Sequence, residues 1–217
     1  MIEGLTVEID AEAVVVRSAR PLTVVSSAVV GGGLGAALAI ANLHVTKGFR
    51  GEQTERVLGD FARCRALADP WVGLLTAAWT EKAEQATATA DGLTALAVVT
   101  VGLGNVIGAG RSPAAAWASS TINTIVVVDA DPEPAALVNL VMTVTETKSL
   151  ALAEAGVRAA DGGLGSGTST DAVVVAATGR GRACRFGGPA SELGAVVASA
   201  AKTALDAGVR RWVQEHR

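Results

Sequence analysis

Apolar residues along the chain alternate or cluster in short segments that polar turns separate. LTVEI and AVVVRS flank the polar residues DAE, a pattern that predicts an opening β-hairpin. LTVVSSAVV predicts a further strand that runs into the glycine cluster of residues 31–35. TINTIVVVDA is a nearly continuous apolar run and predicts the most buried strand of the fold.

Two further hairpins are predicted from the turn residues between apolar segments. Asp91 and Gly92 separate EQATATA from LTALAVVTVG, and an Asp-Gly pair suits the positive φ angles of a tight two-residue turn. TDAVVVAAT and ACRF lie on either side of Gly179-Arg180-Gly181, so we expect these two segments to pair as well.

Three segments have helical spacing. Residues 53–67 place apolar side chains on one side of a helical wheel. Residues 134–155 predict the first long helix, which DPEP introduces and Gly156 ends. Residues 189–208 predict the second long helix, with a proline in its first turn and a glycine near its end.

Hairpins outnumber β-α-β units in this pattern. The sequence therefore predicts an α+β fold in which helices cover a mixed, largely antiparallel β-sheet. A length of 217 residues fits a single domain that spans residues 1–217.

Composition narrows the classes of function. Half of the residues are hydrophobic and 18% are charged, which excludes a disordered chain. A net charge of −3 provides no basic surface for nucleic acid, so no nucleic-acid partner is expected. Cys64 and Cys184 form neither a metal-ligand cluster nor a disulfide framework. Together with an acidic N-terminus that lacks the apolar core of a signal peptide, they predict a cytoplasmic protein.

Residues 21–45 contain no charged side chain and are long enough to cross a bilayer. The segment also contains a glycine cluster and several polar residues, so we interpret it as a buried segment and expect no membrane partner. Within it, GGGLGA matches the dinucleotide-binding pattern G-x-G-x-x-A, and Glu52 follows at about the expected spacing of 20 residues. The intervening residues are too few for the full β-α-β unit, so a glycine turn that allows close backbone approach is the preferred interpretation.

His44 lies in an apolar stretch beside Asn42 and Lys47. It is either a hydrogen-bonded core residue or a general base or proton donor. The other histidine, His216, lies in the terminal QEHR and is expected to be solvated. Because no second histidine and no cysteine cluster accompany His44, no metal site is predicted.

Lys148 occupies an unusual position on the first long helix. A helical wheel places it in the middle of an apolar stripe and places Glu146 on the opposite side, as a solvated or rim residue. The lysine either extends to solvent at the helix edge or marks a polar pocket beneath the helix. In the second case, Asp171 is its natural partner. The stripe consists of Leu137, Val141, Val144, Leu152 and Ala155.

The stretch GSGTSTD combines glycines, hydroxyl side chains and Asp171 at the entrance to a valine-rich strand. Such a loop binds an oxyanion or activates a hydroxyl nucleophile, or its side chains simply bond to its own backbone. A Gly-Thr junction also occurs in hydrolases that cleave themselves to expose an N-terminal threonine nucleophile, and this alternative stays open.

Three motifs occur in succession: ALVNLVMTVTETKSLALAEAGV, SGTSTDAVVVAATG and GGPASELGAVVASA. With the upstream ANLHV, GLLTAA and VTVGLGNVIGAG, they resemble the adenosylcobinamide amidohydrolase family over residues 24–208. The resemblance implies hydrolysis of the amide that joins aminopropanol to a propionate side chain of the corrin ring, giving adenosylcobyric acid for coenzyme B12 salvage. The cobalt would enter with this corrinoid substrate, so no cofactor of the protein itself is expected.

The family motifs place their lysine on Lys148 and their Thr-Asp pair on Thr170 and Asp171. Asp171 would then act as the base or orient Lys148, and His44 or Lys148 would protonate the leaving amine. The family pattern reads Ala-Thr-Gly-Thr where this chain has Ser-Gly-Thr-Ser at residues 166–169, which leaves open which hydroxyl acts. The predicted catalytic residues are therefore Asp171, Lys148, His44 and Thr168.

Substrate contacts are predicted around this set and at two glycine-rich edges, residues 31–35 and 102–110, that suit a flat macrocycle. Backbone N–H groups between Gly165 and Ser169 are candidate oxyanion donors. The sequence leaves open whether the protein forms a homo-oligomer. Two other functions also stay open: a corrinoid-binding protein without activity, and an N-terminal-threonine hydrolase that acts on another amide. The predicted substrate-binding residues are Asn42, Asn105, Asn123, Gly165, Ser166, Gly167, Ser169, Thr170, Glu146 and Glu192.

Overall fold

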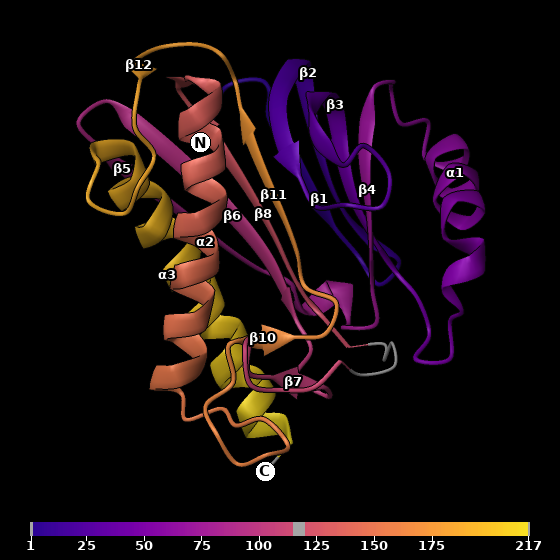
Figure 1. The fold of residues 1–217 in the computed structure, drawn as a ribbon. Helices are drawn as coiled ribbons and strands as arrows, with labels where there is room; N and C mark the ends of the chain where they lie inside the picture. Colours follow the sequence, from indigo (N-terminus) through magenta and orange to yellow (C-terminus); the bar gives the residue numbers. More distant parts are fainter. Residues whose placement is uncertain (1, 115–119, 217) are drawn as a thin grey trace.

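The structure is a computed structural model that describes residues 2–114 and 120–216. Its main sheet has the strand order β4-β3-β2-β11-β8-β6-β5, and β1 pairs with β2 (Figure 1). Neighbours are antiparallel except for the pairs β3–β4 and β8–β11, so the predicted mixed, largely antiparallel α+β fold is confirmed. The strands are β1 (Leu5–Ile9), β2 (Ala13–Ser26), β3 (Gly33–His44), β4 (Trp71–Thr76), β5 (Glu84–Ala90), β6 (Leu93–Val101), β8 (Ile122–Asp129) and β11 (Ala172–Ala177).

Two pairs of very short strands lie outside the main sheet. β7 (Val106–Ile107) pairs with β10 (Gly167–Thr168), and β9 (Asp131–Pro132) pairs with β12 (Ala183–Cys184). The helices are α1 (Thr54–Cys64), α2 (Pro134–Glu154) and α3 (Glu192–Glu215), with the 3-10 turns η1 (Gly51–Gln53) and η2 (Thr80–Lys82).

The main sheet folds over on itself through the long ribbon of β2 and β3. The pairing register of this ribbon shifts between Arg17 and Leu22. Beyond the shift, residues 23–26 pair with β11, whereas the other end of the ribbon, through residues 39–44 of β3, borders β4. The two halves of the sheet therefore face each other, and aliphatic side chains from both, such as Ile40, Leu74 and Ile125, fill the space between them.

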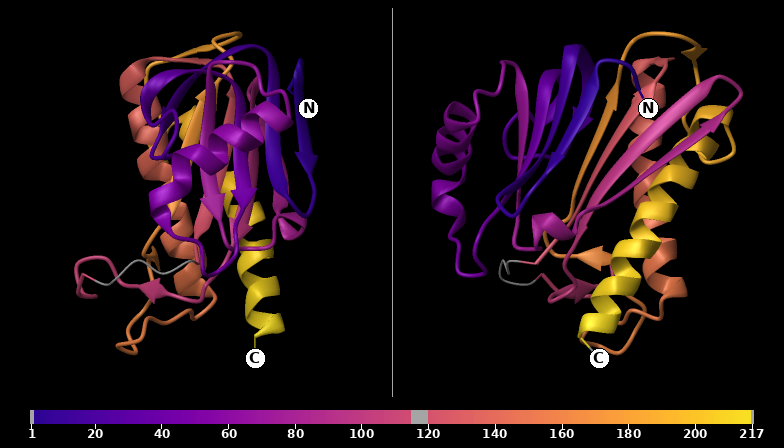
Figure 2. Two further views of the ribbon diagram at one scale, coloured as in Figure 1. Left: turned by 90° about the vertical axis from the view of Figure 1, so that its right-hand side faces the viewer. Right: turned by 180° about the vertical axis from the view of Figure 1, so that it is seen from behind.

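Helices cover both outer faces of the folded sheet, which gives four layers (Figure 2). On one side, α1 packs Leu58 and Phe61 against Ala41 and Leu43 of β3. On the other side, α2 and α3 bury their apolar faces against β6, β8 and β11. Small and β-branched residues dominate these layers, because closely packed strands leave little room for large side chains.

Two of the predicted hairpins form. β1 and β2 pair as expected, and β5 and β6 pair around Asp91 and Gly92, whose φ angles are 51° and 76°. The separate strand predicted for LTVVSSAVV is wrong, because its residues 22–26 continue β2 past the irregularity.

The third predicted hairpin, between β11 and the ACRF segment, is wrong. β11 pairs with β2 and β8, and β12 pairs with β9. After β11 the backbone N–H groups of Thr178 and Gly179 donate to the carbonyls of Val128 and Ala130. The chain therefore continues along the end of β8 and does not turn back at residues 179–181.

The long helices form with shifted ends. α2 ends one residue earlier than predicted. α3 starts at Glu192, because Ser191 caps it by accepting a hydrogen bond of 3.1 Å from the backbone N–H of Gly194. It continues through Gly208 to Glu215: a Cβ at Gly208 would lie 2.7 Å from Val101 Cγ2, so this glycine serves the contact with β6 and does not end the helix.

The charge-free residues 21–45 contain the second part of β2 and all of β3. No helix within the described residues is both long and apolar enough to cross a membrane. GGGLGA leads into a strand, so it lacks the helix that a dinucleotide site needs. Gly31, with φ 70°, instead passes close to β4, where a Cβ would lie 2.7 Å from the Trp71 carbonyl oxygen.

Candidate active site

Several strand ends meet at one end of the folded sheet. β8 begins at Ile122 opposite Val101, the last residue of β6, and Asp171 directly precedes β11. The short pair β7–β10 lies at this same end, beside α2 (Figure 1). The arrangement brings the predicted loop of residues 165–171 against the buried face of α2.

Lys148 and Asp171 form an ion pair beneath α2. The distance from Lys148 Nζ to Asp171 Oδ2 is 2.5 Å, and each side chain is 9% exposed. Burial of either charge alone would be strongly unfavourable, so each group requires the other. The structure thus brings together the two residues that the helical wheel and the strand entrance had singled out.

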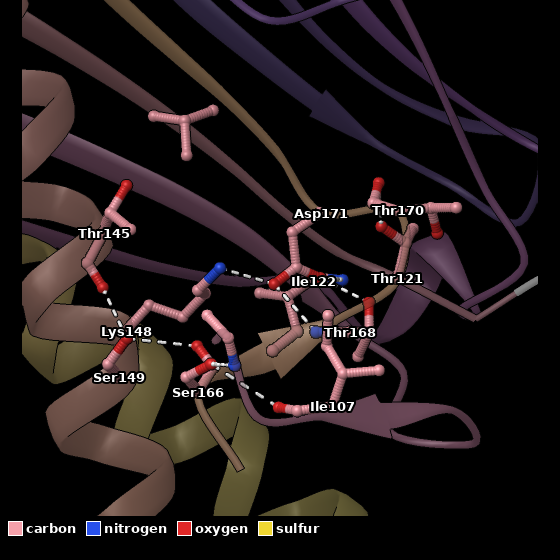
Figure 3. A network of polar contacts seen from close by, with 12 residues as sticks. Ile107, Thr121, Ile122, Thr145, Lys148, Ser149, Ser166, Thr168, Thr170 and Asp171 are labelled. Carbon is pink, nitrogen blue, oxygen red and sulfur yellow. Dashed lines mark hydrogen bonds and ion pairs between the residues drawn. The ribbon is translucent and has the colours of Figure 1, made fainter. Parts of the chain in front are cut away.

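The carboxylate of Asp171 accepts four hydrogen bonds (Figure 3). Oδ2 accepts from Lys148 and, at 3.0 Å, from the backbone N–H of Thr168. Oδ1 accepts from the Thr168 hydroxyl and, at 3.0 Å, from the backbone N–H of Ile122. Helix α2, strand β10 and strand β8 therefore hold one carboxylate from three directions. We call Lys148, Asp171 and Thr168 the charged cluster.

Gly167 makes the charged cluster possible. A Cβ at this position would lie 2.4 Å from Asp171 Oδ2 and 2.9 Å from Lys148 Nζ. Only a residue without a side chain lets the backbone of β10 approach the ion pair this closely. Sequence reasoning assigned this glycine to substrate binding and missed its packing role, because the approach of β10 to α2 is not local in sequence.

The loop amides proposed as oxyanion donors are largely engaged within the protein. Gly165 N donates to the Val157 carbonyl and Ser166 N to the Ile107 carbonyl, each at 2.9 Å, while Thr168 N donates to Asp171. These three groups hold the loop in place, so the structure does not present them to a substrate.

The loop side chains also make internal contacts. Ser166 Oγ accepts from the backbone N–H of Ala109 at 2.8 Å, and Ser169 Oγ accepts from Asn105 Nδ2 at 2.6 Å. Thr170 Oγ1 donates to the Ser120 carbonyl at 3.2 Å. These contacts attach the loop to the residues around β7 and to Ser120, two residues before β8.

Asn42 and Asn123 lie on the inner side of the sheet, where they join its two halves. Asn123 Nδ2 donates to Asn42 Oδ1 and to the Leu75 carbonyl, both at 2.8 Å. Asn42 Nδ2 donates to Thr100 Oγ1 at 2.9 Å, and Thr121 Oγ1 donates to Asn123 Oδ1 at 3.2 Å. Both asparagines are 1% exposed, so their amides serve the protein interior. We call Asn42, Asn123, Thr100 and Thr121 the amide cluster.

The remaining predicted residues lie away from the charged cluster. His44 ends β3, contacts the Ala78 carbonyl through Nδ1 at 2.9 Å and stacks on Trp79. Glu146 is exposed on α2. Glu192 pairs with Arg182, which also contacts the carbonyl of Asp91 in the β5–β6 turn, at the far end of the sheet. The structure therefore does not bring Glu146 or Glu192 to this site.

Two adjoining cavities open at the same end of the sheet and share Ala77 and Ser120. The smaller, of about 160 Å³, has Asp171, Thr170 and Asn123 among its walls, so it reaches the charged cluster at Asp171. The larger, of about 760 Å³, is lined by the following residues among others: Trp79, Lys82, Gly102, Gly104, Asn105, Arg211, Trp212 and Glu215.

Sequence reasoning found only part of the larger cavity. Gly102 and Gly104 belong to a predicted macrocycle edge, whereas the edge at residues 31–35 contributes to the described lining of neither cavity. Arg211 and Trp212 were missed because the predicted helix stopped at Gly208. The apolar spacing of Val209, Trp212 and Val213 is the signal that could have extended it.

Comparison with known proteins identifies a family. The model of the adenosylcobinamide amidohydrolase family matches residues 1–217. A search of curated proteins finds no match.

Two solved structures align with most of this chain. The PH0078 protein of Pyrococcus horikoshii OT3 is 11% identical, with a TM-score of 0.49 over 98% of this chain and 83% of that one. A beta-aminopeptidase of Burkholderia sp. is 13% identical, with a TM-score of 0.46 over 94% of this chain and 79% of that one.

Proposed function

The chain belongs to the adenosylcobinamide amidohydrolase family, and from this premise we propose that it hydrolyses the amide linking aminopropanol to the corrin ring of adenosylcobinamide. The products are aminopropanol and adenosylcobyric acid, which re-enters coenzyme B12 synthesis. One observation carries the proposal for the site: a buried Lys148–Asp171 pair, bonded to the hydroxyl of Thr168, beside a cavity that Asp171 helps to line. The cobalt belongs to the substrate.

Thr168 supplies the nucleophile in this proposal. Its hydroxyl donates its one proton to Asp171 Oδ1, which leaves the oxygen lone pairs to attack the substrate carbonyl carbon. As the new C–O bond forms, the proton moves to Asp171. The ammonium of Lys148, on the other oxygen of the same carboxylate, offsets the negative charge of the tetrahedral intermediate.

Collapse of this intermediate breaks the amide C–N bond. Lys148 gives a proton to the nitrogen of aminopropanol and takes up the proton that Asp171 received from Thr168, which restores the ammonium and the carboxylate. The corrin carboxyl group is then an ester of Thr168. One water molecule hydrolyses this ester, with Asp171 as its base, and restores the threonine hydroxyl. One amide and one water thus yield one amine and one carboxylic acid.

The experiment is incubation of the purified chain with adenosylcobinamide, followed by mass spectrometry of the small molecules. We expect aminopropanol and adenosylcobyric acid in equal amounts. Thr168→Ala should lower the rate about 10³-fold, and Thr168→Ser should retain part of it. Thr145→Ala is the matched control, because this hydroxyl donates to the Val141 carbonyl on the exposed side of α2. Unchanged adenosylcobinamide with the wild-type chain would refute the function.

Intact-protein mass spectrometry during turnover separates the candidate nucleophiles. An ester on Thr168 adds the mass of the corrinoid acyl group to the 21.7 kDa chain. A chain that cleaves itself before Thr168 would instead appear as two fragments. Normal turnover by Thr168→Ala, without any adduct in the wild type, would show that water attacks directly.

A further inference from the structure

The larger cavity is not needed for the reacting amide, which the smaller cavity can hold. Its volume of about 760 Å³ lies within the usual range for small-molecule sites. It lies between η2 and the last turns of α3, and it borders the smaller cavity through Ala77 and Ser120. A substrate whose amide enters the smaller cavity therefore places another of its parts here.

Tryptophan forms one wall of this cavity. Trp79 is 58% exposed, although an indole ring gains free energy when it is buried. The His44 ring stacks behind it, with the centroids 5.0 Å apart and an interplanar angle of 15°. His44 is itself fixed by the Ala78 carbonyl. The indole is thus held in one orientation with much of its surface uncovered, as a stacking platform requires.

A second indole lines the cavity from α3. The rings of Trp212 and His216 stack with their centroids 4.1 Å apart and an interplanar angle of 7°. His216 Nδ1 contacts the Trp212 carbonyl at 2.9 Å, which fixes this pair as well. Two tryptophans backed by histidines are suited to a flat aromatic ligand.

The charged groups of the lining favour a neutral ligand rich in hydrogen-bond acceptors. Lys82 pairs with Glu215, and Arg211 pairs with Glu84, so these charges compensate each other. The hydrogen bond from Lys82 lowers the pKa of Glu215, so this carboxylate is ionised near neutral pH. Paired charges of this kind favour a neutral ligand, and the ring nitrogens of adenine accept hydrogen bonds from N–H groups such as those of Lys82 and Arg211.

We propose, resting on the proposed function, that this cavity binds the adenine of the substrate's axial adenosyl group between Trp79 and Trp212. The axial ligand and the peripheral aminopropanol chain leave the macrocycle in different directions. Two adjoining cavities receive them together, with the reacting amide at Asp171. His44 is then a positioning residue for Trp79, in place of the proton donor expected from sequence.

Binding of free 5′-deoxyadenosine, measured by calorimetry on the whole chain, tests the cavity without any corrinoid. We expect the wild type to bind it, and Trp79→Ala or Trp212→Ala to weaken binding at least about fivefold. Phe186→Ala is the matched control, because this phenylalanine is also exposed, at 64%, but lies outside the cavity lining. Equal binding by all four proteins would overturn the proposal.

Selectivity provides the second readout. Cyanocobinamide carries the same amide without the adenosyl group, so the wild type should show a higher kcat/KM for adenosylcobinamide. His44→Ala should raise the KM for adenosylcobinamide and leave kcat unchanged, because it disturbs only the platform. A fall in kcat at unchanged KM would instead make His44 the proton donor and overturn its positioning role.

The two proposals can fail separately. Equal kcat/KM for both corrinoids, without binding of 5′-deoxyadenosine, would overturn the adenine site and leave the hydrolase intact. Tryptophan-dependent binding of 5′-deoxyadenosine without hydrolysis of either corrinoid would refute the proposed reaction and support the adenine site.

Discussion

The charged cluster and the amide cluster are both buried at the same end of the sheet, but they are built from different chemistry. The amide cluster connects the two sheet halves through neutral hydrogen bonds that Asn42 and Asn123 share. The charged cluster lies on the helix side, and one carboxylate there takes donors from three elements. Neutral amides suffice to join the halves. A buried ion pair is weak evidence for stability, which makes the charged cluster the one to explain by chemistry.

Separating the ion pair should have the largest effect on stability. Lys148→Met leaves the Asp171 carboxylate buried without its cation, and we expect the free energy of unfolding to fall by about 3–5 kcal/mol. Urea unfolding at pH 7 measures this change. The double variant Lys148→Met/Asp171→Asn removes both charges and should recover at least about half of the loss. A double variant no more stable than Lys148→Met would contradict the pairing.

Gly167→Ala tests whether the Lys148–Asp171 ion pair tolerates being displaced by a side chain at position 167. The new methyl group would collide with Asp171 Oδ2, so the pair must move. We expect a loss of about 1–3 kcal/mol in stability and about 10²-fold in kcat. Gly35→Ala is the control, because a Cβ there meets no atom within 4 Å and should change neither quantity. Wild-type kcat in Gly167→Ala would show that the pair tolerates displacement.

Asn123→Ala makes the matching change in the amide cluster. It removes the donors to Asn42 Oδ1 and the Leu75 carbonyl, which should lower stability by about 1–3 kcal/mol. We expect kcat for the folded protein to stay within about tenfold of the wild type, because no charge is lost at Asp171. A loss of kcat as large as that of Gly167→Ala would place the amide cluster in the catalytic machinery.

An exposed ion pair near the same loop should have the smallest effect. The hydrogen bond from Arg111 holds the pKa of Asp161 below its ordinary value of 3.8. Because the folded state has the lower pKa, this stabilisation is present above the unfolded value and is lost as the pH falls through the folded value. Arg111→Met should therefore slightly lower the Tm at pH 6, and the difference should shrink as the pH falls below 3.8 and vanish once it is below the lowered pKa of Asp161. A difference that grows in acid would contradict this sign.

Local periodicity singled out Lys148 as a charged residue on an apolar helix stripe, which either extends to solvent or has a buried partner. The Asp-Gly turn and the buried strand at residues 122–129 were likewise readable from neighbours in sequence. The bend in β2, the pairing of β11 with β2 and the approach of Gly167 to the ion pair were not. Each depends on contacts between segments far apart in the chain, where no local pattern specifies the register.

The prediction for α3 failed for a related reason. Gly208 resembles a helix stop in sequence, but its small size serves a contact with Val101 more than one hundred residues away. The end of α3 beyond Gly208, which the prediction left out, leads to Trp212 and His216. Both residues line the larger cavity, so the sequence did not reveal it. His44 shows the same limit: its sequence context left a core role and a proton-donor role open, and its stacking on Trp79 became visible only in three dimensions.

The most direct test of the central claim is the rate of aminopropanol release from adenosylcobinamide by the folded double variant Lys148→Met/Asp171→Asn. The variant separates chemistry from folding, because it lacks both charges and should keep much of the stability. If the charged cluster catalyses the hydrolysis, the double variant releases aminopropanol at least about 10³-fold more slowly than the wild type. A rate within about tenfold of the wild type would contradict the account.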